Sequence, residues 1–418
     1  MTNGTPNILN SRGDLQVSTY IVDAGKPINN VVVRISPPNN RQNILAELFT
    51  NLSGQTEVID LPAPPLEYSL SPSGLQPYSQ YDVSIFGEGF KPVFVSGVQI
   101  LPDTLSYLNV SLFPDIQNGS LVDVIGIAPN TLYGDYPPKI PEDPVKPLPK
   151  TKGLVVLSDV VVPEFVIVHD GVPTDTSAPN YWVTFENYIK NVASCEIYST
   201  WPESAIRANI LAILSFTLNR VYSEWYQNKG FPFTITSSTA FDQKFVYGRN
   251  IYAGISNTVD QIFTSFITRP NIRQPLLTQY CDGSKTFCPG WLSQWGSKSL
   301  AEEGYGAIDI LKYYYGSDIY LMTAQKVEGV PVSYPGIPLQ IGSTGADVRA
   351  IQMQLNAISN NYPAIPKLKV DGIYGAKTME SVEIFQEIFA LPVTGIIDSA
   401  TWYKISYIYV AVTKIAQL

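Results

Sequence analysis

The segment Glu186 to Asn209 reads E-N-Y-I-K-N-V-A-S-C-E-I-Y-S-T-W-P-E-S-A-I-R-A-N and decides how the centre of the chain folds. Apolar residues recur at three- and four-residue spacing, which predicts an amphipathic helix from about Thr184 to Cys195. Glu196 follows directly. A second helix is predicted to begin at T-W-P-E, where Thr200 fits the cap position and Glu203 completes a capping box. One carboxylate, Glu196, is therefore expected at a junction between packed helices, where it can be directed into a cleft.

Helical spacing continues beyond this segment. The second helix is predicted to run to Trp225, a third from Ser256 to Thr268 and a fourth from about Lys298 to Tyr315. A strand pair is expected to open the region near residue 151, and His169 lies in the apolar run E-F-V-I-V-H-D-G, which favours a strand residue. Residues 151–330 therefore predict a mixed α+β domain.

The region before this domain has a different pattern. Residues 15–133 contain short β-rich runs such as V-V-V-R-I-S and Y-D-V-S-I-F, separated by Gly and Pro turns, which predicts a β-sandwich after a tail over residues 1–14. Residues 134–150, G-D-Y-P-P-K-I-P-E-D-P-V-K-P-L-P-K, are rich in proline and predict an extended, exposed linker. An exposed linker is either a plain spacer or a site where a protease can cut.

Composition and charge exclude several classes of function. The formal net charge of −9 argues against binding free nucleic acid, which needs an excess of Lys and Arg. No apolar run approaches the roughly 20 residues that span a bilayer, and no secretory signal is evident at the amino terminus, so synthesis in the cytosol is expected.

Metal and cysteine chemistry is also constrained. A single histidine, His169, cannot supply the ligand set of a zinc amidase or peptidase, so neither a metal nor a cofactor is expected. Three cysteines are too few for a disulfide scaffold. Cys195 is expected to be buried in its helix, whereas Cys281 and Cys288 can close a small loop or help to hold a metal.

The last 80 residues carry a recognisable pattern. After a short linker over residues 331–338, the chain contains L-Q-I-G-S-T-G-A-D-V-R-A-I-Q-M-Q-L, V-D-G-I-Y-G-A-K-T-M-E-S-V-E-I-F-Q and V-T-G-I-I-D-S-A-T-W-Y-K-I. Residues 339–418 thereby resemble the three-helix, type 1 peptidoglycan-binding domain. The resemblance implies a small helical bundle that binds cell-wall glycan or stem peptide near Asp371, Gly372 and Gly375.

The central region resembles the SpoIID family of lytic transglycosylases. The block Y-I-K-N-V-A-S-C-E, followed by S-A-I-R-A-N, places Glu196 on the family's catalytic position. A second block, L-S-Q-W-G-S-K-S-L-A-E-E-G followed by I-L-K-Y-Y-Y-G, matches its S-Q-x-G and I-L-x-x-Y-Y elements, and Gln243 matches a glutamine of its middle segment. The chain departs from the family at Leu214, where an arginine is usual, and in Q-Y-C-D-G-S-K-T-F-C-P-G, which lacks the histidines that some members place around zinc.

The order of the three parts resembles that of clostridial spore cortex-lytic enzymes, with an amino-terminal sandwich like a transthyretin or carboxypeptidase regulatory domain. The resemblance implies a zymogen that is made without a signal peptide and stored in the spore. It also implies activation by a germination protease that cuts near the proline-rich linker. The amino-terminal sandwich is expected to cover the cleft until then.

A lytic transglycosylase can work with one carboxylate. The acid protonates the glycosidic oxygen that leaves C1 of N-acetylmuramic acid, and the carboxylate then takes the proton of the sugar's own C6 hydroxyl as a 1,6-anhydro ring closes. Glu196 is the expected acid. Substrate contact is expected from Gln243, Tyr280, Ser293 and Gln294.

Two other functions fit the residues. One is a non-catalytic wall-binding or structural protein that uses the sandwich and the terminal unit. The other is a muramidase-type hydrolase, which needs a second acid such as Asp242 to activate water. Glu203 is a rival acid, although its expected capping role accounts for it, and the tyrosines Tyr313 to Tyr315 are expected in the core.

Overall fold

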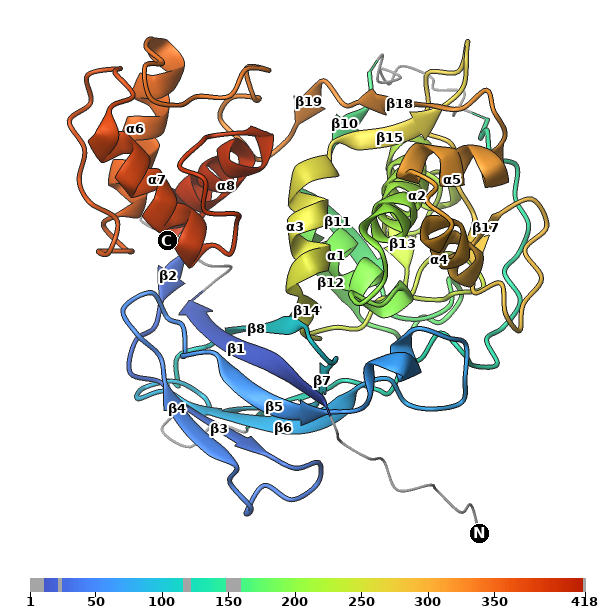
Figure 1. Cartoon of the computed structure of the whole chain (residues 1–418), viewed down its shortest axis with the longest axis horizontal. Helices are drawn as coiled ribbons and strands as arrows, with labels where there is room; N and C mark the ends of the chain where they lie inside the picture. Colours follow the sequence, from blue (N-terminus) through green and yellow to red (C-terminus); the bar gives the residue numbers. More distant parts are fainter. Residues whose placement is uncertain (1–10, 22–24, 116–121, 148–158, 416–418) are drawn as a thin grey trace.

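The computed structural model describes residues 11–21, 25–115, 122–147 and 159–415. Figure 1 shows three bodies: a strand-rich amino-terminal part, a mixed central part and a helical carboxyl-terminal part. The central and carboxyl-terminal parts share one hydrophobic core, and the amino-terminal part has its own. The predicted multidomain organisation, with strands first and helices last, is confirmed at this level.

Two five-stranded sheets lie in the amino-terminal part. One has the order β14-β8-β1-β2, in which β5 also pairs with β1 and β14 (Ile251–Tyr252) comes from the central part, and the other has the order β4-β3-β6-β7-β9. Alternate side chains such as Val17, Val33 and Val83 point into the core between the sheets. The predicted sandwich pattern is therefore present, although its first strand begins within the expected tail. The strands are β1 Ser11–Ile21, β2 Lys26–Pro27, β3 Val32–Ser36, β4 Ala46–Phe49, β5 Ile59–Ala63, β6 Ser79–Phe86, β7 Val93–Ile100, β8 Leu105–Ser111 and β9 Asp123–Gly126.

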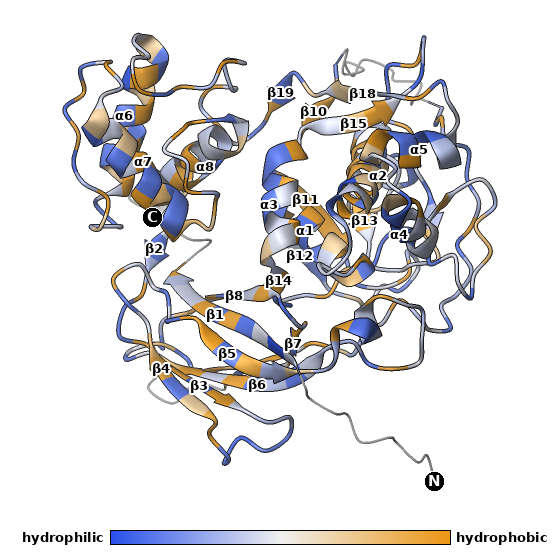
Figure 2. Cartoon of the chain, in the orientation of Figure 1, coloured by the Kyte–Doolittle hydropathy of each residue, from blue (hydrophilic) through white to orange (hydrophobic). Residues whose placement is uncertain are grey.

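The central part is built around the helix α2, which is buried on nearly all sides. Figure 2 shows its hydrophobic colouring, which a surface helix would carry on one stripe alone. Helices α1, α3, α4 and α5 surround it. The helices are α1 Phe185–Glu196, α2 Glu203–Tyr222, α3 Ala253–Ile262, α4 Gln294–Glu302 and α5 Ala307–Tyr315. The strands are β10 Val161–Val162, β11 Phe165–His169, β12 Asn180–Thr184, β13 Ile235–Thr236, β14 Ile251–Tyr252, β15 Ser265–Thr268, β16 Tyr280–Cys281, β17 Leu292–Ser293, β18 Tyr320–Thr323 and β19 Lys326–Val327.

The central part attaches to the sandwich by extending one of its sheets. Strand β14 pairs antiparallel with β8, so that Ile251 lies opposite Tyr107. Beside it, the Asn250 side chain accepts a hydrogen bond from the Gln99 backbone and donates one to the Gln99 carbonyl, at 3.0 and 2.7 Å. Backbone pairing of this kind fixes both register and orientation.

The predicted capping box of the second helix is wrong. The helix begins at Glu203 with Pro202 in the cap position, and no side chain caps it. Thr200 instead donates to Ser69 Oγ at 2.8 Å, and the Trp201 indole donates to the Ser69 carbonyl at 2.9 Å. The Thr200 hydroxyl, which was expected to cap the helix, therefore forms a hydrogen bond with the sandwich instead.

Two other helix predictions need correction. The third helix is α3, which ends at Ile262, because residues 265–268 pair with β18 as strand β15. The predicted fourth helix is two helices, α4 and α5, which the turn at Gly304 separates. Gly304 has a φ of +92°, a backbone conformation that a continuing helix cannot contain.

The proline-rich segment is extended and largely exposed, as predicted, but several of its residues anchor it to the central part. Residues 130–147, here called the strap, lie along the central part, while residues 148–150 fall outside the described ranges. Arg220 of α2 is fully buried and binds Glu142 of the strap through both oxygens, at 2.5 and 3.1 Å. Lys146 is buried and pairs with Glu142 at 2.7 Å. Prolines keep the strap extended, but long-range ion pairs hold it in place.

Acid is expected to loosen the strap. Burial raises the pKa of Glu142, but the hydrogen bonds and charges of Arg220 and Lys146 outweigh it and hold the pKa below its ordinary value of 4.5. A carboxylate of this kind contributes stability that is present above its unfolded pKa and is lost as pH falls through its folded pKa. Hydrogen exchange of residues 134–147, corrected for intrinsic rates, should be faster at pH 3 than at pH 6, and Glu142→Gln should reduce the difference. Equal protection at both pH values in the unmodified chain would contradict this.

The carboxyl-terminal part is a bundle of α6 Ala346–Ile358, α7 Ala376–Ile388 and α8 Ser399–Ile415. It docks on the central part through Lys404 of α8, which lies 3.3 Å from Asp260 of α3 and 3.4 Å from Glu186 of α1. In the described ranges, none of the helices combines the length and apolar character that a bilayer crossing needs.

Candidate active site

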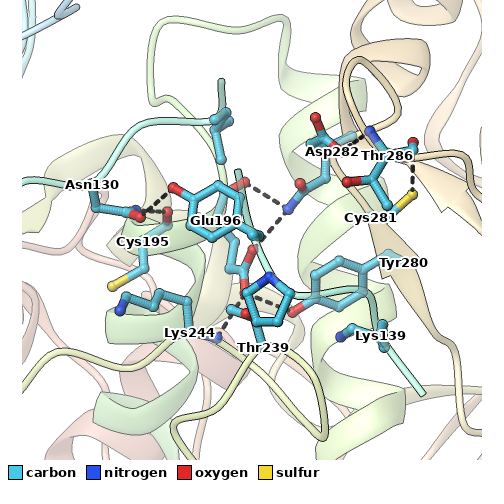
Figure 3. Close-up of a pocket in the computed structure, with 14 residues that line it drawn as sticks. Asn130, Lys139, Cys195, Glu196, Thr239, Lys244, Tyr280, Cys281, Asp282 and Thr286 are labelled. Carbon is cyan, nitrogen blue, oxygen red and sulfur yellow. Dashed lines mark hydrogen bonds between the residues drawn. The ribbon is translucent and has the colours of Figure 1, made fainter. Parts of the chain in front are cut away.

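Glu196 is the last residue of α1, because the helix continues one residue beyond its expected end at Cys195, and 9% of the surface of Glu196 is exposed. Its side chain enters a pocket in the central part, where Figure 3 shows it between Asn130 and Tyr280. Lys244 donates its backbone N–H to Glu196 Oε1 at 2.8 Å. The helix end and this bond give the carboxyl group a fixed direction.

Tyr280 forms part of the same pocket wall. It is buried, and its hydroxyl donates to Glu196 Oε1 at 3.4 Å. Burial and then the charge of Glu196 raise the pKa of Tyr280 well above its ordinary value. The phenol therefore stays protonated at neutral pH and keeps its hydrogen available for the carboxylate.

Gln294 holds the carboxyl group from the other side. Its amide nitrogen donates to Glu196 Oε2 at 3.0 Å and to the Glu196 carbonyl at 2.8 Å, so one side chain fixes both ends of the residue. Ser293, the preceding residue, caps α4 by accepting the Gly296 N–H at 2.9 Å. The Ser293 hydroxyl thus caps the start of α4, and the Gln294 amide is directed at the carboxyl group of Glu196.

For the glycan cleavage that the sequence resemblance implies, Gln294→Leu is expected to lower the rate about 10- to 100-fold, because a hydrogen bond to a charged group contributes roughly 1.5–3 kcal/mol. The leucine fills similar space, so thermal unfolding should change little by comparison. The check is kcat on cortex glycan beside the melting temperature. Unchanged kcat would show that this amide does not position the acid.

Gln243 is fully buried and lies behind the pocket wall. Its carbonyl oxygen accepts from Tyr188 at 3.1 Å and from Thr217 at 2.9 Å, and its amide reaches the Ile213 carbonyl at 3.2 Å. It also lies within hydrogen-bond reach of Tyr280. These contacts favour a role for Gln243 in positioning Tyr280 over the predicted contact with substrate.

The strap forms the remaining wall of the pocket, through Asn130, Leu132, Tyr136, Pro137 and Lys139. Asn130 donates to the Cys195 carbonyl at 2.6 Å, and the Lys139 ammonium donates to the Asp242 carbonyl at 2.6 Å. Burial lowers the pKa of Lys139 to about 8, although the charge of Glu196 opposes this shift. The pocket has about 60 Å³ of free volume. This is far below the 300–1,000 Å³ of typical ligand sites.

Asp282 is a pocket residue that the sequence did not single out. Within the described residues, Glu196 and Asp282 are the carboxylates that line this pocket. Asp282 accepts the backbone N–H groups of Lys285 and Thr286 at 2.9 and 3.1 Å. Its place directly after a strand and before a Gly-containing loop fits this turn-forming role, and this is the signal that could have found it.

The two other acids considered from the sequence lie elsewhere. Asp242 is fully buried and accepts bonds from Arg220, Tyr226 and Thr236 at 2.6 to 2.9 Å, so both its oxygens have structural partners. Glu203 is exposed at the first turn of α2. Neither lines the Glu196 pocket.

The cysteines resolve the choice that the sequence left open. Cys281 and Cys288 form a disulfide that closes a loop beside the pocket. Cys195 is buried in α1 as expected, and Arg249 donates to its sulfur at 3.3 Å. His169 ends β11 and stacks on Phe233 with ring centroids 4.4 Å apart.

The second predicted site lies in the carboxyl-terminal bundle. Gln352 of α6 accepts the backbone N–H groups of Asp371 and Gly372 at 3.1 and 2.9 Å. The Ile373 N–H and the Gln352 amide lower the pKa of Asp371. Gly375 caps α7. These bonds shape the loop from Asp371 to Gly375 and leave the exposed Ile373 on its surface.

Comparison with known families identifies this bundle. Residues 344–405 match the family model PG_binding_1, a peptidoglycan binding domain. The predicted resemblance is therefore confirmed over residues 344–405, and this part of the chain carries a peptidoglycan-binding domain.

Solved structures add partial likenesses. The crystal structure of the SleB N-terminal domain is 32% identical, over 18% of this chain and 93% of that chain, with a TM-score of 0.16. The 5-hydroxyisourate hydrolase of Klebsiella pneumoniae is 17% identical, over 26% and 99%, with a TM-score of 0.15. GBS52, the minor pilin of Streptococcus agalactiae, is 16% identical, over 27% and 49%, with a TM-score of 0.17. At such TM-scores these likenesses carry no argument for function. No curated protein matches the chain at a significant level.

Proposed function

We propose that this chain is a peptidoglycan lytic transglycosylase that cleaves N-acetylmuramic acid to N-acetylglucosamine linkages, with spore cortex as its substrate. The observation that carries the proposal is the Glu196 pocket, where Lys244, Tyr280 and Gln294 all donate to one carboxyl group. The peptidoglycan-binding domain supports the choice of polymer. The resemblance to SleC-type spore cortex-lytic enzymes supports the choice of cortex and of germination as the time of action.

The reaction follows from one acid that changes role. Protonated Glu196 gives its proton to the glycosidic oxygen, the bond from that oxygen to C1 of the muramic acid breaks, and the electron pair leaves with the oxygen. The C6 hydroxyl of the same sugar then bonds to C1 and returns its proton to Glu196. The acid is regenerated, the 1,6-anhydro ring is closed, and no water is consumed. Gln294 and the Lys244 N–H keep the carboxyl group facing the same point in both steps.

A muramidase-type hydrolase is the second candidate, and Asp282 is the observation that favours it. Asp242, the second acid considered first, has structural partners for both oxygens and lies outside the pocket. Asp282 does line the pocket, although its oxygens bind two backbone N–H groups of its own loop. Asp282→Asn should leave cleavage within about tenfold in a transglycosylase, whereas a hydrolase would lose its base and roughly 10²–10⁴ in rate.

The products test the proposed function. Cortex glycan treated with the active protein should yield fragments with 1,6-anhydro-muramic ends in mass spectrometry. Reducing ends would favour the hydrolase. Binding of the glycan without cleavage by any form of the chain would favour the non-catalytic wall-binding alternative.

We further propose that the chain is a zymogen and that the strap is what its activation displaces. Five strap residues wall the pocket and leave about 60 Å³ of free volume in it. A germination protease that cuts the chain near the carboxyl-terminal end of the proline-rich linker would leave the strap held to the central part only by non-covalent contacts such as Arg220 to Glu142. Equal rates of cortex digestion by the full-length and cut forms would refute this proposal.

A further inference from the structure

Phe287 is the most exposed large apolar side chain among the described residues, with 85% of its surface open to solvent. It lies in the loop that the disulfide between Cys281 and Cys288 closes. Keeping an aromatic ring in water gives up the stabilisation that burial would provide. An exposed ring on a cross-linked loop is therefore available for contact with a partner outside the folded chain.

The loop is held in a fixed shape. The Asp282 carboxylate accepts two backbone N–H groups within it, from Lys285 and Thr286. Gly283 has a φ of +71°, and a Cβ there would lie 1.8 Å from Ser293 Oγ, so the loop packs directly against the start of α4. A ring presented from such a loop loses little conformational freedom when it binds.

The loop is continuous with the Glu196 pocket. Cys281 and Thr286, on either side of its tip, both line that pocket (Figure 3). Lys285 also reaches across to the strap, 3.1 Å from Asp135 and 4.6 Å from the centre of the Tyr133 ring. The loop and the strap thus border the same opening, and displacement of the strap would leave the loop as a free edge.

We propose that Phe287 is a sugar-stacking residue at the rim of this pocket, with the apolar C–H face of a peptidoglycan sugar as its ligand. The inference rests on the proposed function, because a glycan that places one linkage at Glu196 must extend over the rim. Aromatic rings bind such faces through apolar contact. Phe287 is adjacent to the lining residue Thr286. Trp182, the next most exposed aromatic side chain at 71%, is a weaker candidate, since its ring contacts Phe165 and no residue of its strand β12 lines the pocket.

Phe287→Ala is expected to raise KM for cortex glycan about five- to tenfold and to leave kcat within about twofold, because the stacking contact is uniform through the reaction. Phe287→Tyr keeps the ring and should stay near the wild-type KM. Phe113→Ala is the matched control, because Phe113 is an exposed phenylalanine of the sandwich. The assay uses whichever form of the chain digests cortex, whole or cut. Equal KM for the Phe287→Ala and Phe113→Ala variants overturns the proposal.

A binding measurement separates this inference from the proposed function. If no form of the chain cleaves glycan, the proposed function fails, and hydrogen exchange decides the role of Phe287. The probe is a purified tetrasaccharide of alternating N-acetylglucosamine and N-acetylmuramic acid, added to the Glu196→Gln chain in both its full-length and its cut form, and protection in either form counts. Protection of residues 281–288 that disappears in the Glu196→Gln, Phe287→Ala double variant supports the inference. An unprotected loop, or equal protection in both chains, overturns it.

Discussion

Glu196→Gln is expected to abolish glycan cleavage, with kcat lowered by at least about 10³-fold, near the upper range for loss of a general acid and base. The amide has the size of the carboxyl group but can neither donate the first proton nor accept the second. Folding should persist, because the amide oxygen can still accept the N–H of Lys244 and the hydroxyl of Tyr280. The measurement is the rate of release of soluble glycan beside a melting curve.

Glu203→Gln is the control for this experiment. Glu203 is exposed at the start of α2 and lies outside the pocket, so its neutralisation should leave cleavage unchanged. Glycan binding by the Glu196→Gln chain should also persist, since the peptidoglycan-binding domain is untouched. Retained cleavage in the Glu196→Gln variant would reject Glu196 as the acid.

Arg220→Met is expected to destabilise the central part by about 3–5 kcal/mol, the usual effect of removing one partner from a buried ion pair. The Arg220 side chain is fully buried. It forms ion pairs with Asp242 at 2.7 Å and with Glu142 of the strap at 2.5 Å. Methionine fills part of the space but leaves the Asp242 charge without its cation. Urea unfolding of the full chain, followed by tryptophan fluorescence, measures the loss.

Arg207→Met, on the same helix, is the matched control. Arg207 is partly exposed and makes one long hydrogen bond, 3.4 Å, to Gln261. Its loss should cost less than about 1 kcal/mol, as for surface polar contacts in general. Similar destabilisation by both substitutions would mean that the buried cluster does not hold the strap and α2 together.

Local patterns predicted the elements that depend on local interactions. The apolar face before Glu196 predicted α1 to within one residue at each end, and the glycine-punctuated repeats after residue 339 predicted the carboxyl-terminal bundle. The capping box failed because the Thr200 hydroxyl binds Ser69, which is 131 residues away in the sequence. Gly304 was the available sign that the fourth helix is interrupted, since its conformation suits a turn and not a helix interior.

The anchoring of the strap to the central part could not be predicted from local sequence. Proline content correctly predicts an extended chain, but Glu142 and Lys139 find their partners 78 and 103 residues away, at Arg220 and Asp242. Tyr136 and Val145 among the prolines were the remaining hint that this segment packs against protein. The pocket was likewise predicted only in part. Gln294 and Tyr280 were named, and Asp282 carried a turn signal that went unused, whereas the Lys244 backbone N–H needed the three-dimensional structure.

The most direct test of the claim that Glu196 acts as the single acid is to digest cortex glycan in water enriched with ¹⁸O. The masses of the new muramic ends are then measured by mass spectrometry. A single acid that lets the sugar's C6 hydroxyl attack C1 predicts anhydro ends about 18 mass units lighter than reducing ends, without ¹⁸O, because water is not a reactant. Reducing ends that carry one ¹⁸O each would contradict the account, since they would show that water attacks C1.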